Sequence, residues 1–296
     1  MRIAFIGVGA MGAGMAANLA KAQHQVMAFD LNPELVAKAV AAGCEAASSA
    51  AEAVRGAEAV ITMLPAGAHV RGVYAADILP NAAPGTLLID CSTIDIESAR
   101  AVAADAKAAG FRAADAPVSG GTAGAEAGTL AFMVGCEEAD FAAIDAILQP
   151  MARAVVRAGT SGGGQAAKIC NNMLLGISMI GVAEAFALAE KLGLEAQAFF
   201  DIASKSSGQC WSLTSYSPWP GQVETAPSNR GYEGGFLTRL MLKDLKLSQE
   251  AASKAGAVTP LGAEAAALYG LFDQMGYGGK DFSAVLQLMR GKLDEL

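Results

Sequence analysis

A glycine-rich turn close to the start of the chain constrains the fold more than any other feature. Residues 2–7 predict a buried strand, and the strand runs into a GxGxxG pattern formed by Gly7, Val8, Gly9, Ala10, Met11 and Gly12. In such a pattern the first glycine permits a tight turn, the second lets the backbone approach a pyrophosphate, and the third allows close packing of helix on sheet. The following helix N-terminus offers N–H groups to phosphates. The pattern therefore predicts a dinucleotide site in a βαβ unit.

The second predicted strand, residues 25–30, ends in an acidic residue that bears on the choice of dinucleotide. Asp30 follows Gly12 by 18 residues. A carboxylate at this place accepts hydrogen bonds from ribose hydroxyls, and it would repel the 2′-phosphate of NADP. We therefore expect NAD as the cofactor, with Asp30 and the adjacent Leu31 among its contacts. A glycine turn without a ligand is the alternative, and the strand, the helix and Asp30 together disfavour it.

Strands and helices alternate through the first half of the chain. Further strands are predicted at 59–64, 87–90 and 112–116, with extensions at 130–134 and 154–157, and helices at 11–22, 33–42, 68–76, 95–108 and 139–148. This alternation predicts a parallel sheet. After three glycines at 162–164, residues 165–191 predict one long helix that is apolar on most faces, and the remainder has helical periodicity. The predicted fold is α/β: a Rossmann domain over 1–163 is joined by the long helix to an all-α substrate and oligomerisation domain over 164–296.

Composition excludes several classes of protein. Hydrophobic residues make up 53% and charged residues 17%, which argues against disorder, and the net charge of −8 disfavours nucleic acid and anionic membranes as partners. The five cysteines form no CxxC pair and there are only two histidines, so we expect no disulfide framework and no metal site. Free thiols suit a reducing compartment.

The most membrane-like stretch, residues 173–183, lies between Lys168 and Glu184. This stretch is shorter than the roughly 20 residues of a membrane span, so we expect a buried helix and no membrane partner. The chain starts directly with strand-like residues and shows no targeting signal, so a bacterial-type cytoplasmic enzyme is expected.

Three loops are expected at the carboxyl edge of the sheet, where parallel strands bind ligands. Leu64 with Pro65 and Ser92 with Thr93 follow predicted strand ends, and we expect cofactor contacts there, with plain turn chemistry as the alternative. The third loop contains Ser119, Gly120 and Gly121. Its hydroxyl and backbone N–H groups could hold a carboxylate, although a flexible loop is the alternative.

Lys168 is the candidate general base. It lies in the first turns of the long apolar helix, and Asn171 and Asn172 share its face. Oxidation of an alcohol needs a base for the hydroxyl proton, and no histidine is well placed. Burial and a cationic nicotinamide would both favour the neutral amine. The alternative, a lysine reaching solvent at a helix end, leaves the polar neighbours unexplained.

Four motifs in order resemble the β-hydroxyacid dehydrogenase family over nearly the whole chain. They are the glycine turn with Asn18 and Leu19, the loop 115–121 followed by 128–130, the segment 162–168 with Asn171 and Asn172, and 243–245. Segments 206–211, 216–221, 231–236 and 281–283 resemble the 3-hydroxyisobutyrate branch. The chain departs from the family pattern in the third glycine of the segment 162–164. The histidine that 6-phosphogluconate dehydrogenases carry beside the lysine is absent, and imine reductases replace the lysine.

The resemblance implies a role for each matching residue. Lys168 would be catalytic with help from Asn172; Ser119, Gly120 and Gly121 would bind the substrate carboxylate. Leu64, Pro65, Thr93 and Lys243 would contact the cofactor, and Asp244 would lie near the substrate. Trp211 and Phe236 could form an apolar wall for a methyl group, with ordinary core packing as the alternative.

The activity implied is NAD-dependent oxidation of 3-hydroxyisobutyrate to methylmalonate semialdehyde, a step of valine breakdown, by a homodimer or homotetramer. L-serine, tartronate semialdehyde and succinate semialdehyde are the alternative substrates, because a methyl-sized difference is worth only about 1–3 kcal/mol. A non-catalytic dinucleotide-binding protein is the alternative of another class. The joint presence of Lys168, Asn172 and Ser119 argues against it.

Overall fold

The computed structural model describes residues 1–296, and the chain divides into two compact units, 1–168 and 169–296. Each unit has apolar cores of its own. The first unit combines a sheet with helices, and the second consists of helices and loops. The predicted fold class, a Rossmann domain followed by an all-α region that starts with a long helix, is confirmed.

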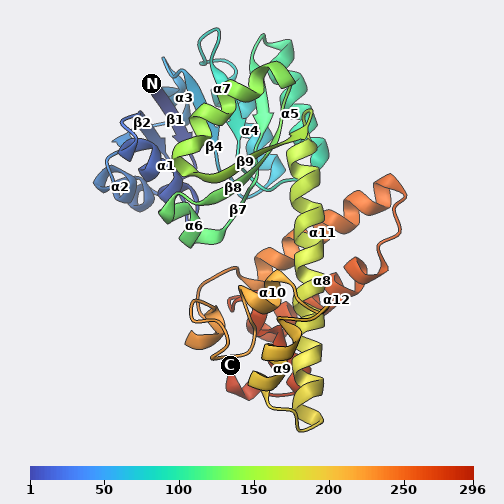
Figure 1. The fold of residues 1–296 in the computed structure, drawn as a ribbon. Helices are drawn as coiled ribbons and strands as arrows, with labels where there is room; N and C mark the ends of the chain where they lie inside the picture. The colour runs from blue at the N-terminus through green and yellow to red at the C-terminus, as the bar shows by residue number, and fades with distance from the viewer. The chain divides into compact units, whose positions relative to one another are not determined.

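The sheet of residues 1–168 has nine strands, and Figure 1 shows helices around it. The strands are β1 Arg2–Ile6, β2 Gln25–Phe29, β3 Glu45–Ala46, β4 Ala59–Thr62, β5 Leu87–Asp90, β6 Arg112–Asp115, β7 Val118–Ser119, β8 Leu130–Gly135 and β9 Ala152–Gly159. Their order is β3-β2-β1-β4-β5-β6-β8-β7, and β9 pairs with the other edge of β8. Strands β1 to β6 are parallel, whereas β8 runs antiparallel to β6 and β7. The first six strands have the order of a dinucleotide-binding doubly wound sheet.

Helices cover both faces of this sheet. They are α1 Gly12–Lys21, α2 Pro33–Ala41, α3 Ala50–Val54, α4 Gly67–Val73, α5 Ile96–Ala108, α6 Gly121–Ala127, α7 Glu138–Leu148 and the start of α8 Gly163–Lys191. One apolar core contains Leu19 of α1 and Ile144 of α7, and the other contains Val70 of α4 and Val102 of α5. Strands β1, β4 and β5 are buried almost throughout, so each is a short and mostly apolar run, whereas the two residues of β3 are exposed.

Two strands and two α-helices of this unit were not predicted. Strands β3 and β7 have two residues each, too few for a periodic signal. Helix α3 is short, and its N-terminus is capped by Ser49, whose hydroxyl accepts from the N–H of Glu52. Helix α6 begins at Gly121, the last residue of the loop for which a flexible loop is the alternative, and continues to Ala127. Its glycines disfavour a helix in isolation, and packing against α1 overrides that preference.

The regular secondary structure of residues 169–296 is helical, and loops connect the helices. Besides α8 these residues form α9 Ala196–Ala203, α10 Trp211–Thr214, α11 Thr238–Ala255, α12 Pro260–Phe272 and α13 Val285–Arg290. A single isolated bridge, between Leu237 and Asp281, joins two extended residues. The core of this unit gathers side chains of α8, α11 and α12, with Phe186, Leu245 and Tyr269 among the most buried.

Helix α8 has 29 residues and is long and apolar enough by length and composition to cross a membrane. The sequence predicted this helix at 165–191, but the argument that the stretch 173–183 is too short for a span does not apply to the helix as a whole. Of its most apolar window, 44% is buried inside the protein, and the core helix of a water-soluble protein passes the same test.

Candidate active site

The predicted cofactor and substrate loops of residues 1–168 meet at one edge of the sheet. The last residues of five parallel strands are register partners across the sheet: Ile6, Phe29, Thr62, Asp90 and Asp115. The loops that leave these strands therefore emerge side by side. The carboxyl edge of a parallel sheet is where such folds bind ligands.

The glycine turn has the shape that a dinucleotide requires. Gly7 has a φ of +94°, and a Cβ there would lie 2.3 Å from the carbonyl oxygen of Met63. A Cβ on Gly12 would lie 2.0 Å from the carbonyl oxygen of Gly7, whereas a Cβ on Gly9 would meet nothing within 4 Å. Gly7 and Gly12 are thus required by the packing of strand and helix, while Gly9 faces open space. Helix α1 starts without a side-chain cap, which leaves its N-terminus to a phosphate.

Asp30 directly follows β2 and is held in place by its own loop. One carboxylate oxygen, Oδ1, accepts a hydrogen bond of 2.9 Å from the N–H of Asn32. The other oxygen remains for a ribose hydroxyl. Leu31 is 91% exposed, so its side chain is available for contact with a ligand.

Two predicted cofactor loops are tied together by a buried carboxylate that sequence reasoning did not single out. The N–H of Leu64 donates to Ser92 Oγ (2.8 Å), and Ser92 Oγ donates to Asp90 Oδ1 (2.6 Å). Thr62 donates to the same oxygen (2.7 Å). Burial raises the pKa of Asp90 to about 6, against the opposing effect of these hydrogen bonds. A polar residue ending an apolar strand is the one sequence signal that could have identified Asp90.

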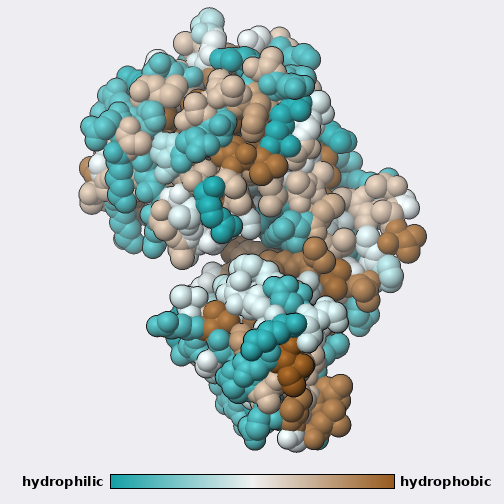
Figure 2. Space-filling view, in the orientation of Figure 1, coloured by the Kyte–Doolittle hydropathy of each residue, from teal (hydrophilic) through white to brown (hydrophobic).

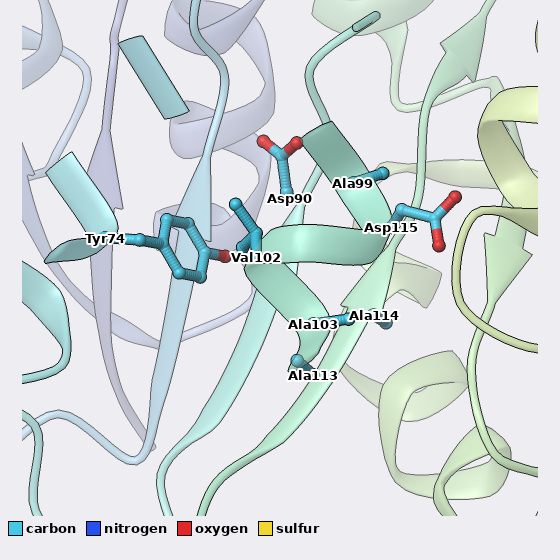
Figure 3. A pocket seen from close by; sticks show the side chains of 8 residues that line it. All are labelled: Tyr74, Asp90, Ala99, Val102, Ala103, Ala113, Ala114 and Asp115. Atoms are coloured by element: carbon cyan, nitrogen blue, oxygen red, sulfur yellow. The ribbon is translucent and has the colours of Figure 1, made fainter. Parts of the chain in front are cut away.

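A small cavity lies beneath this edge (Figure 3). It is lined by Tyr74, Asp90, Ala99, Val102, Ala103, Ala113, Ala114 and Asp115. The volume of about 10 Å³ suits one water molecule and is too small for a substrate. Oδ2 of Asp90 is buried without a hydrogen-bond partner. The cavity is therefore part of the support of the site and not the substrate pocket.

The predicted carboxylate loop forms β7 and the start of α6. Gly120 has a φ of +141° and Gly121 of +64°, conformations that favour glycine, and α6 begins without a side-chain cap. The amide of Asn18 on α1 donates to the carbonyl of Ala125 (2.7 Å), which fastens α6 to the dinucleotide helix. Ser119 is partly buried at the end of β7. The loop thus offers a hydroxyl and helix N–H groups from a fixed position.

Lys168 ends the first unit. It lies on α8 and is 7% exposed, so it does not extend into solvent as a lysine at a helix end can. The start of this helix is held by Asp115, whose carboxylate accepts from the N–H groups of Gly162 (2.7 Å) and Gln165 (2.8 Å). A buried lysine near the end of a parallel sheet is a functional candidate.

In residues 169–296, helix α8 contacts α11 through predicted site residues. Asn172 is 1% exposed, and its amide donates to Oδ2 of Asp244, which is also buried. Asn171 donates in turn to Asn172 Oδ1 (3.0 Å). Lys243, the neighbour of Asp244 on α11, is partly buried. The structure therefore brings Asn172 and Asp244 together, as a shared role requires.

Trp211 and Phe236 belong to one aromatic cluster without touching each other directly. Trp211 stacks on Tyr216 with ring centroids 4.9 Å apart, and Phe236 packs edge-on against Phe282 at 5.7 Å. Asp281 belongs to the segment 281–283, to which the sequence assigned a family resemblance but no role; it accepts from the hydroxyl of Tyr216 (2.8 Å) and the N–H of Phe236 (2.7 Å). Trp211 is 51% exposed, so ordinary core packing does not account for it.

The fold and these residues define the class, which is that of a dinucleotide-dependent oxidoreductase. Residues 2–159 match the family model described as the NAD binding domain of 6-phosphogluconate dehydrogenase. Residues 162–289 match the model described as NAD-binding of NADP-dependent 3-hydroxyisobutyrate dehydrogenase. The first model covers the region with the sheet, and the second covers the helical region.

Individual relatives extend over nearly the whole chain. An NAD-dependent L-serine dehydrogenase of Pseudomonas aeruginosa is 50% identical over 97% of both chains. A 3-hydroxyisobutyrate dehydrogenase of the same organism is 50% identical over 98% of this chain and 99% of its own. A solved structure of the Mycobacterium tuberculosis 3-hydroxyisobutyrate dehydrogenase with L-serine is 48% identical, with a TM-score of 0.94 over 97% of this chain and 98% of its own. The chain belongs to the 3-hydroxyisobutyrate dehydrogenase family of β-hydroxyacid dehydrogenases, and residues 2–159 are its NAD-binding domain.

Proposed function

We propose that this enzyme oxidises the primary alcohol of 3-hydroxyisobutyrate to methylmalonate semialdehyde with NAD, as a step of valine breakdown. The observation that carries the proposal is Lys168, a buried lysine on the helix that begins at the carboxyl edge of the dinucleotide-binding sheet. The relatives named 3-hydroxyisobutyrate dehydrogenase support the same substrate.

Lys168 is the proposed general base. NAD, when bound, accepts the hydride from the carbinol carbon. The neutral amine of Lys168 takes the hydroxyl proton as the carbonyl forms, and in the reverse direction the ammonium returns it. Asn172 orients the substrate or the lysine from the next turn of the helix. Ser119 and the N–H groups of Gly120 and Gly121 bind the substrate carboxylate, which fixes the alcohol for transfer.

The proposed choice of NAD over NADP rests on Asp30. The second family model is described by NADP, whereas the Pseudomonas relative is described by NAD. Oδ1 of Asp30 accepts from the N–H of Asn32, and a 2′-phosphate near this carboxylate would meet like charge. Leu31, Leu64, Pro65, Thr93 and Lys243 are the further proposed cofactor contacts.

L-serine is the second candidate substrate. It is favoured by the name of one relative at 50% identity and by the L-serine in the M. tuberculosis structure. L-serine carries an ammonium where 3-hydroxyisobutyrate carries a methyl group. The aromatic side chains of Trp211 and Phe236 favour the methyl group, whereas the carboxylate of Asp244 would favour the ammonium. Discrimination of about 10–200-fold is the range that such a difference supports.

The first test is NADH formation with 3-hydroxyisobutyrate, L-serine, glycerate, 4-hydroxybutyrate and 6-phosphogluconate. We expect kcat/KM to be at least about tenfold higher for 3-hydroxyisobutyrate, which is about 1.4 kcal/mol in transition-state binding. A preference for L-serine would move the substrate assignment to the second candidate.

Lys168→Ala tests the base. We expect kcat to fall about 10²–10⁴-fold, as for loss of a general base. Lys191→Ala is the matched control, because Lys191 is an exposed lysine of the same helix. Equal activity of the two variants would contradict the role of Lys168.

We also propose a homodimer or homotetramer. Most of the large apolar side chains that are exposed belong to residues 169–296, among them Leu188, Leu192 and Leu261, and Figure 2 shows apolar side chains at the surface of this unit. Exposed apolar patches mark interaction surfaces. Light scattering on the wild type and on Leu192→Glu measures the oligomeric state. A monomeric wild type would contradict the proposed homodimer or homotetramer.

The five free cysteines support a site of action in the bacterial cytoplasm.

A further inference from the structure

Gln165 lies in the first turn of α8 and is completely buried. Its side-chain oxygen accepts from the N–H of Ile94 (3.1 Å), and its side-chain nitrogen donates to the carbonyl of Ser92 (2.7 Å). The two backbone groups flank Thr93, the proposed cofactor contact after β5. The N–H of Ile94 needs an acceptor, and the carbonyl of Ser92 needs a donor. Among side chains of this size only an amide supplies both groups in one plane.

The backbone of Gln165 is fixed as firmly as its side chain. Its N–H donates to Asp115 Oδ2 (2.8 Å), and the N–H of Gly162 donates to Asp115 Oδ1 (2.7 Å). A Cβ on Gly164 would lie 2.3 Å from the carbonyl oxygen of Met133 on β8. The helix therefore starts in direct contact with the strand ends and cannot slide along them. Gln165 joins this fixed start to the loop of residues 92–94.

Lys168 follows Gln165 by three residues, which places the two as neighbours on the helix surface, about 5–6 Å between Cβ atoms. The loop at Thr93 and the amine of Lys168 are thus connected through one buried side chain and one helical turn. A shift of either would change the distance between the hydride acceptor and the proton acceptor. Misplacement by about 1 Å can cost about 10²-fold in rate.

We propose that Gln165 is a positioning residue that fixes the cofactor loop 92–94 relative to Lys168. This inference rests on the proposed function, because it assigns Lys168 to proton transfer. The side chain of Gln165 bonds to the backbone groups of Ile94 and Ser92. It acts through the two backbone groups that it holds and through the lysine that follows it.

The test uses the full chain and two substitutions. Gln165→Met keeps the length of the side chain and removes both hydrogen bonds, whereas Gln165→Glu keeps the acceptor for Ile94 and loses the donor to Ser92. The matched control is Gln287→Met. Gln287 is also a buried glutamine on a helix, 4% exposed, and it bonds to Tyr232 and Arg290, neither of which is a proposed site residue.

Hydrogen exchange in the NAD-free protein is the readout that does not need activity. We expect the amide of Ile94 to exchange about tenfold faster in Gln165→Met than in the wild type, because it loses its acceptor, and to be unchanged in Gln287→Met. Unchanged exchange in Gln165→Met would overturn the inference, because the loop would then not depend on this side chain.

Steady-state kinetics provide the second readout. We expect kcat to fall about 10–100-fold in Gln165→Met and by less in Gln165→Glu, with a larger isotope effect from deuterium at the carbinol carbon. The dissociation constant of NAD should change by less than about threefold, because no proposed cofactor contact is removed. A normal kcat in folded Gln165→Met, or an equal loss in Gln287→Met, would overturn the inference.

Failure of the proposed function has a different signature. An active Lys168→Ala variant, or a wild type that turns over no hydroxy acid, would refute the proposed chemistry while the exchange of Ile94 still shows whether Gln165 holds the loop. Fast exchange of Ile94 with a normal kcat would instead leave the chemistry intact and refute the positioning role.

Discussion

Replacing Asp281 by alanine should destabilise residues 169–296 strongly, because four donors converge on this one carboxylate. Oδ2 accepts from the hydroxyl of Tyr216 and the N–H of Phe236, and Oδ1 accepts from the N–H (3.0 Å) and the hydroxyl (2.5 Å) of Ser283. Asp281 is completely buried. Alanine would leave these donors without an acceptor in the interior.

The magnitude follows from two opposing contributions. Four hydrogen bonds to a charged acceptor, at about 1.5–3 kcal/mol each, set an upper limit of roughly 6–12 kcal/mol. Removal of a buried charge offsets part of this loss, and burial does raise the pKa of Asp281. We therefore expect a decrease of about 3–5 kcal/mol in the free energy of unfolding, the range seen when a buried charged network loses its centre.

Tryptophan fluorescence measures the unfolding of this unit selectively. Both tryptophans of the chain, Trp211 and Trp219, lie in residues 169–296. Urea unfolding of Asp281→Ala is compared with Tyr216→Phe, which removes one donor and should cost about 1 kcal/mol. The exposed Asp201→Ala should stay within about 0.5 kcal/mol of the wild type. A loss below about 1 kcal/mol for Asp281→Ala would refute the reasoning.

Three further predictions concern charge. Burial raises the pKa of Asp90 to about 6, so residues 1–168 should lose stability as the pH rises from about 4 to 6. Asp90→Asn should abolish this loss when urea unfolding is followed by circular dichroism. Parallel curves of stability against pH for the wild type and the variant would contradict the prediction. Hydrogen bonds from Arg290 and Lys292 lower the pKa of Glu190 to about 2. The stability that Glu190 provides should be complete above about pH 4.3 and disappear toward pH 2. The free energies of unfolding of the wild type and Glu190→Gln, measured by tryptophan fluorescence, should therefore converge in acid. A difference in stability that stays constant with pH would contradict the prediction. Asp30→Ser should raise the ratio of kcat/KM for NADP to that for NAD by about 10–100-fold, and an unchanged ratio would remove Asp30 from cofactor selection.

The centre of the sheet could be predicted from the sequence because strands β1, β4 and β5 are buried almost throughout. Such strands are short apolar runs, as at Ala59–Thr62 and Leu87–Asp90, and the helices between them have ordinary lengths. The glycine turn was predictable for a second reason, since Gly7 and Gly12 leave no room for a Cβ. Helix α6 was not predictable, because its stability comes from contact with α1 and not from its own glycine-rich sequence.

The support of the site could not be predicted because its partners are distant in the sequence. Gln165 bonds to residues 71 and 73 positions away, and Asp115 bonds to residues 47 and 50 positions away. Nothing in the local sequence of either residue specifies such a pairing. The residues that face a ligand follow motifs, whereas the residues that hold them in place depend on which strand lies beside which.

Two buried carboxylates of residues 1–168, Asp90 and Asp115, hold different parts of the proposed site. Asp90 holds the loops at Leu64 and Ser92, which are the proposed cofactor contacts, and Asp115 holds the start of the helix that carries Lys168. The two are register partners on neighbouring strands, so the sheet itself sets their separation. In the proposed mechanism, the hydride acceptor and the proton acceptor are therefore both positioned by carboxylates that lie in the core of the domain.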